Sequence, residues 1–126
     1  PVAVTASAVY DAVKGATGVS FSDMSFALED FYSLSASDLE DYVLYMPDMS
    51  TDIQEVLVAK AKSGKLESVK SACTARQQGM KEDAEFYGST GEYVDGYKLA
   101  TNGDWVLFYV GPSASAAVKA FNDCTK

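Results

Sequence analysis

The chain has 126 residues, with 18 acidic and 10 basic side chains, and its formal net charge is −8. This length suits one domain with a sizeable core, and 48% apolar residues exclude an intrinsically disordered chain. The negative charge argues against nucleic acid, whose phosphates require lysine and arginine, and against docking on anionic lipid.

The N-terminal part of the chain predicts two helices. Residues 1–4 are expected to be the remnant of a leader, and residues 5–126 a single domain. Thr5 can cap a first helix over residues 6–14. A second, shorter helix is expected through residues 26–31, which are followed by a turn.

A β-hairpin is the strongest feature of the middle of the chain. Residues 40–46 and 54–61 are rich in β-branched and aromatic side chains, which favour strands. Residues 47–52 between them are turn formers. Two such runs on either side of a turn predict two antiparallel strands.

The C-terminal half predicts a long helix, a second hairpin and a last helix. Residues 65–86 carry an apolar stripe at helical spacing. Residues 94–100 and 105–110 are expected to be strands joined by a turn at Asn102-Gly103. A last helix is expected to begin after residues 111–113, where proline suits the first turn.

Together these elements predict an α+β fold. Two hairpins, each followed by a helix, indicate a four-stranded antiparallel sheet with both helices on one face. The strands are apolar on both sides, whereas a sheet with one wet face would alternate apolar and polar residues. We therefore expect the N-terminal helical segment to cover the second face; a partner subunit, giving a homodimer, or a ligand is the alternative.

Histidine is absent, which bears on both catalysis and metal binding. Ser-His-Asp and Cys-His catalysis and most zinc sites are therefore excluded. Asp48, Ser50 and Asp52 have the opening spacing of a calcium loop, but Ile53 stands where that loop needs glycine and Ala59 where it needs glutamate. We predict no metal, no cofactor and no catalytic residue.

Two cysteines, Cys73 and Cys124, each lie on the apolar stripe of a predicted helix. If these helices pack side by side, the two cysteines can form a disulfide, which an exported domain permits. The alternative is a pair of buried, inert thiols.

Aromatic side chains in the predicted strands are the candidate contact residues. They are Tyr42, Tyr45, Trp105 and Tyr109. Aromatic residues in strands commonly fill the core. On an open face they would suit a sugar, a peptide or a protein, because tyrosine and tryptophan dominate such contacts.

The run Asp41-Tyr42-Val43-Leu44-Tyr45-Met46-Pro47, with the second strand and the start of the long helix, resembles a family of uncharacterised bacterial lipoprotein domains. The resemblance covers about residues 26–121. It implies a Gram-positive origin and an extracellular domain held at the cell membrane by a lipidated cysteine upstream of Pro1. It implies no activity and no catalytic residues.

The function predicted from these observations is non-enzymatic binding at the cell surface, through the sheet face or its edge, to a protein, peptide or glycan. The alternative is a glycan hydrolase that uses carboxylates. Glu29, Asp30, Asp38, Glu40 and Asp41 flank an aromatic run, and such enzymes need two carboxylates facing each other. The other explanation is that these acids cap the starts of helices or lie on the surface in contact with solvent.

Overall fold

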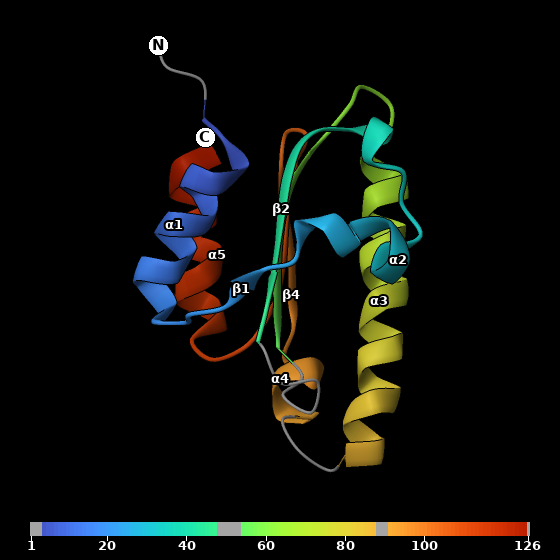
Figure 1. Cartoon of the computed structure of the whole chain (residues 1–126). Helices are drawn as coiled ribbons and strands as arrows, with labels where there is room; N and C mark the ends of the chain where they lie inside the picture. Colours follow the sequence, from blue (N-terminus) through green and yellow to red (C-terminus); the bar gives the residue numbers. More distant parts are fainter. Residues whose placement is uncertain (1–3, 48–53, 88–90, 126) are drawn as a thin grey trace.

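The computed structural model describes residues 4–47, 54–87 and 91–125. Helices and strands make up most of the described chain (Figure 1). In chain order they are α1 (Ala6–Thr17), β1 (Ser22–Asp23), the 3₁₀ turn η1 (Ser25–Ala27), α2 (Leu28–Tyr32), the 3₁₀ turn η2 (Ala36–Asp38), β2 (Leu39–Met46), β3 (Glu55–Ala61), α3 (Leu66–Tyr87), α4 (Gly91–Asp95), β4 (Lys98–Asn102), β5 (Trp105–Val110) and α5 (Ala114–Thr125).

The sheet is antiparallel throughout and has five strands, in the order β1-β2-β3-β5-β4. The α+β class and the two predicted hairpins are confirmed, but the predicted count of four strands is wrong. The fifth strand is β1, in which Ser22 pairs with Met46 and Asp23 with Tyr45. A strand of two residues is too short to show the alternation by which sequence reveals strands.

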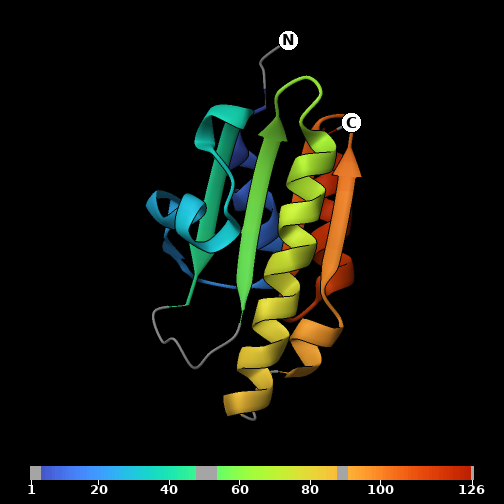
Figure 2. The same cartoon turned by 90° about the vertical axis from the view of Figure 1, so that its right-hand side faces the viewer.

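Helices cover both faces of this sheet. Figures 1 and 2 show α3 and α2 on one face and α1 beside α5 on the other. The prediction that the long helix and the last helix share one face is therefore wrong. The N-terminal segment covers the second face only in part: α1 lies there, as expected, whereas α2 packs on the face of α3. The last helix, α5, shares the second face with α1.

The turn between β5 and α5 directs α5 to the face of α1. Ser113 has a φ of 57°, in the left-handed region. The Tyr109 hydroxyl donates a hydrogen bond to the Pro112 carbonyl oxygen at 2.6 Å. A Cβ atom added to Gly111 would lie 3.0 Å from the same hydroxyl, so this close approach favours glycine.

Two hydrophobic cores result, one on each face of the sheet. Leu57 and Phe108 point toward α3, whereas Val58 and Leu107 point toward α1 and α5. All four side chains are fully buried. This arrangement explains why the strands are apolar on both sides: the chain's own helices bury both faces.

The bounds of most predicted elements match the structure closely, and one predicted strand is partly wrong. The strands at 40–46, 54–61 and 105–110 and the helix at 65–86 are confirmed within one or two residues. The predicted strand at 94–100 is partly wrong, because its first residues belong to the helix α4 and β4 begins only at Lys98.

Candidate functional site

The four aromatic residues predicted as contacts do not gather on one open surface. Tyr42 lies partly buried on the face of α3, whereas Tyr45, Trp105 and Tyr109 lie on the face of α1 and α5. Trp105 and Tyr109 are buried. The Tyr45 ring stacks on that of Tyr10, with centroids 3.7 Å apart and planes inclined by 3°. The structure thus buries two of these four aromatic side chains and partly buries the other two.

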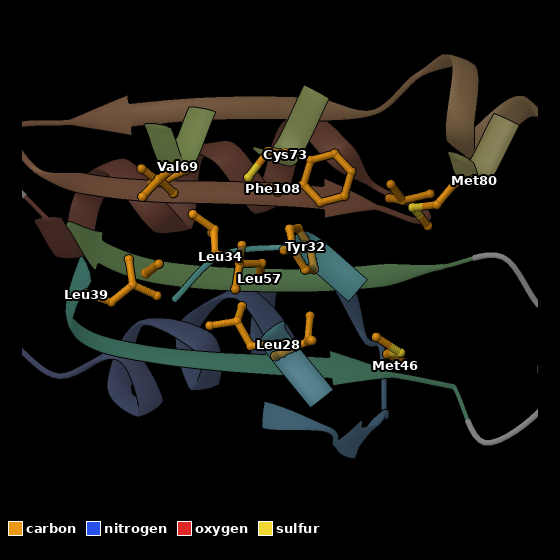
Figure 3. Close-up of a cluster of buried hydrophobic side chains, with 14 of the residues drawn as sticks. Leu28, Tyr32, Leu34, Leu39, Met46, Leu57, Val69, Cys73, Met80 and Phe108 are labelled. Atoms are coloured by element: carbon orange, nitrogen blue, oxygen red, sulfur yellow. The ribbon is translucent and has the colours of Figure 1, made fainter. Parts of the chain in front are cut away.

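The two cysteines lie in different layers. Cys73 of α3 is buried in the core on one face, and Cys124 of α5 is partly buried against the core on the other (Figure 3 labels Cys73). Both are free thiols. The structure therefore favours the alternative of two thiols over the disulfide, because the sheet separates the two helices that would have had to pack side by side.

Thiol titration checks this arrangement. Burial, followed by the negative charge of Glu55, raises the pKa of Cys73 to about 12, so this thiol stays protonated at neutral pH and does not react. We expect a thiol reagent at pH 8 to modify Cys124 alone in the native protein and both cysteines after denaturation. A native protein without any reactive thiol, and with two appearing only after reduction, would contradict the assignment.

Four of the five acids considered for glycan hydrolysis, all except Asp30, have structural partners. The backbone N–H of Ala6, in the first turn of α1, donates to the Asp41 carboxylate at 2.8 Å. The backbone N–H of Ala36 donates to the Glu29 carboxylate at 3.0 Å. The remaining two contacts are exposed ion pairs, Asp38 with Lys65 at 3.9 Å and Glu40 with Lys60 at 3.7 Å. These contacts are those of caps and surface pairs, and none of them favours hydrolysis.

The calcium-like spacing at residues 48–52 lies outside the described residues. Within the described ranges, no group of three or more acids or cysteines could hold a metal ion. Even α3, the longest helix that the structure describes, lacks the apolar stretch that a bilayer span requires.

A buried ion pair between β3 and α3 is the most unusual electrostatic feature of the described chain. Glu55, the first residue of β3, is fully buried. The Arg76 guanidinium donates from Nε to Glu55 Oε2 at 3.1 Å and from Nη2 to Oε1 at 2.8 Å. The Tyr32 hydroxyl of α2 donates to Glu55 Oε2 as well. This two-pronged geometry is the strongest that arginine forms with a carboxylate.

The surroundings of Tyr32 and Arg76 raise the pKa of both groups. Burial and the negative charge of Glu55 raise the pKa of Tyr32 well above its usual range. Burial alone would lower the pKa of Arg76, but its hydrogen bonds and attraction to Glu55 raise it instead. Tyr32 therefore stays protonated and Arg76 charged, and the cluster fixes α2 and α3 to β3 rather than exchanging protons.

The sequence interpretation missed this cluster, although one signal was present. Glu55 occupies the same side of β3 as Leu57, Ala59 and Ala61, which all point into a core. A charged residue in register with buried positions requires a buried partner. The sequence does not identify that partner, since Arg76 and Tyr32 are 21 and 23 residues away along the chain.

Two parts of the described surface are well placed to meet a partner. One is the outer edge of β4, beyond which no further strand of the sheet lies; the short edge strand β1 forms the opposite end of the sheet. The other is the segment of η1 and α2, which carries Phe26, 82% exposed, and Phe31, 40% exposed. These two surfaces are the candidate contact sites.

A comparison with family models gives one match, to the family described as "Domain of unknown function (DUF4358)", over residues 19–111. Neither the curated proteins nor the solved structures give a match. The matched range includes the whole sheet, α2 and α3, but leaves α1 and α5 outside. The range covers well over half of the chain, so this protein belongs to the DUF4358 family, a family of domains of unknown function.

Proposed function

We propose that this domain is a non-enzymatic binding module that takes up an extended peptide segment along the edge of β4. The proposal includes the location that the lipoprotein resemblance implies, outside a Gram-positive bacterial cell and tethered by an upstream lipidated cysteine. Since helices cover both faces of the sheet, its edges are the parts that can still accept a partner, and β4 with five residues is a longer edge strand than β1 with two. The open β4 edge is the single observation that carries the proposal.

The geometry of the second hairpin indicates which backbone groups are available. Asn102 pairs with Trp105 across a two-residue turn, and in such hairpins the flanking pair exchanges both hydrogen bonds. Gly103, with a φ of 60°, begins this turn. Alternation along an antiparallel ladder then directs the N–H and C=O groups of Leu99 and Thr101 away from β5.

An exposed edge of this kind is a template for a further strand. In strand addition, hydrogen bonds between main chains supply affinity, and alternate side chains supply specificity. Leu99 belongs to the core on one face and Ala100 to that on the other, both only partly buried, so each face next to the edge offers an apolar contact. An added strand would bury these two side chains further.

Peptide selection on the immobilised chain tests this proposal. Short peptides are selected from a displayed random library and synthesised, and their affinity is measured by fluorescence anisotropy for wild type, Thr101→Pro and Thr101→Ala. Proline removes the outward N–H and leaves the ladder to β5 intact, as edge strands allow. We expect Thr101→Pro to weaken binding about tenfold or more and the matched Thr101→Ala to have little effect.

One result of this measurement would contradict the proposal. Equal affinity of the selected peptides for wild type and Thr101→Pro would contradict binding at the β4 edge. N-methylation of every second peptide residue is a further check, because it removes hydrogen bonds to the edge without changing the side chains.

A further inference from the structure

We infer that the η1–α2 segment is a second contact surface, which binds a protein partner with an apolar centre and a basic rim. The inference concerns Phe26 and Phe31 and does not depend on the β4 edge. Among the described residues, only three large apolar side chains are exposed, and two of them lie on this one segment.

The charge of the chain is unevenly distributed around this segment. Residues 15–59 contain nine acids and no lysine or arginine, so their net charge is −9. The other residues contain nine acids and all ten bases, for a net charge of +1, and the two values add up to −8. Phe26 and Phe31 lie within this acidic stretch of the sequence, and apart from Glu55, which is buried and paired with Arg76, its acids favour a cationic partner.

Three exposed acids near the two phenylalanines in sequence take part in no ion pair within the described part of the chain, although the Arg76 guanidinium lies against Phe31. Glu29 and Asp30 are exposed in α2, between Phe26 and Phe31, and Asp23 is exposed in β1. None of the ion pairs among the described residues includes these three acids. The segment therefore presents aromatic rings bordered by negative charge, which a pocket bordered by lysine or arginine complements.

The same charge disfavours the other possible occupants. A second copy of the chain would bring one acidic surface against another, and an anionic membrane would repel it. A protein partner with a basic rim would instead be attracted over a distance and would associate faster at low salt.

The buried cluster beneath the segment holds one of the two rings, that of Phe31, in place. Tyr32 fixes the end of α2 to Glu55, and Figure 3 shows Leu28 and Tyr32 of α2 among the buried side chains of this core. The Arg76 guanidinium carbon lies 4.6 Å from the centroid of the Phe31 ring, a cation–π contact. A ring that is already held in place loses little conformational entropy when a partner covers it.

A pair of designed peptides tests the inference. One is an amphipathic helix of leucine and lysine, and the other has glutamate in place of every lysine. Binding is measured by fluorescence anisotropy at low and high salt. We expect the lysine peptide to bind wild type, with an affinity that falls as salt increases, and the glutamate peptide not to bind.

Variants then separate a specific site from general attraction to an acidic protein. The double variant Phe26→Ala, Phe31→Ala is expected to bind the lysine peptide about tenfold more weakly, as for the loss of aromatic anchors. The matched control is Val4→Ala, which removes the third exposed apolar side chain and should not change the affinity. Glu29→Gln with Asp30→Asn should reduce the salt dependence while keeping the oxygen that accepts from Ala36.

Three outcomes would overturn the inference. They are equal binding of the lysine peptide to wild type and to the double phenylalanine variant, equal binding of the glutamate peptide, and self-association of the wild type that Phe26→Ala abolishes. Phe26→Ala alone, at the more exposed position, shows whether a loss of binding reflects a loss of folding. Thr101→Pro should leave this binding unchanged, so the two proposals can fail separately.

Discussion

Replacing Glu55 by alanine is expected to lower the free energy of unfolding by about 3–5 kcal/mol, because it leaves the Arg76 charge buried without its partner. The Arg76 side chain is only 17% exposed and Glu55 is fully buried, so we expect water to replace the lost carboxylate only in part. Such a loss is a large part of the total stability of a domain of this size. Urea denaturation, followed by the fluorescence of the buried Trp105, measures it.

Two further variants show whether burial of the ion pair is the reason for the large loss of stability in Glu55→Ala. Glu67→Ala removes an acid from an exposed pair with Lys70 at 3.4 Å, and exposed pairs contribute less than about 1 kcal/mol. The triple variant Glu55→Leu, Arg76→Met, Tyr32→Phe removes every polar group of the cluster and should recover most of the stability. If Glu55→Ala cost no more than Glu67→Ala, the cluster would not hold α2 and α3 to the sheet.

Replacing Phe121 by alanine is the second change with a large expected effect. Phe121 is fully buried between α5 and the sheet, on the face of α1. We expect a loss of about 3–5 kcal/mol, as for other deletions of a buried phenylalanine. The matched control is Phe26→Ala, the same substitution at an 82% exposed site, which should stay within about 0.5 kcal/mol of wild type.

Double-mutant cycles extend this test to the arrangement of layers. Val9 of α1 belongs to the same core as Phe121, whereas Val69 of α3 belongs to the core on the other face. Truncations in one core should couple by about 0.5 kcal/mol or more, and truncations on opposite faces should add. Coupling of Phe121 to Val69 instead of Val9 would place α5 beside α3, which the structure contradicts.

The roles of some acids could be predicted from the sequence, and the role of Glu55 could not. Asp41, which is partly buried, and Glu29, which is exposed, accept hydrogen bonds from backbone N–H groups. A role as caps was among the predicted explanations for these acids. Glu55 differs because it is buried in β3 and its partners, Tyr32 of α2 and Arg76 of α3, are distant along the chain. The exposure of Phe26 was equally hidden, since the pattern of a short helix does not show which side meets the sheet.

The sequence by itself determined the elements whose signal is local. The strands at 40–46, 54–61 and 105–110 and the helix at 65–86 follow from apolar periodicity over neighbouring residues. Only the tertiary structure decided that β1 joins the sheet, that α5 packs beside α1, and that Cys73 and Cys124 lie on opposite faces. The physical reason is that an apolar stripe indicates that a helix packs against something, but it does not indicate which face of the sheet the helix packs against. When a sheet is apolar on both sides, the connecting turn and the packing of the other helices make that choice.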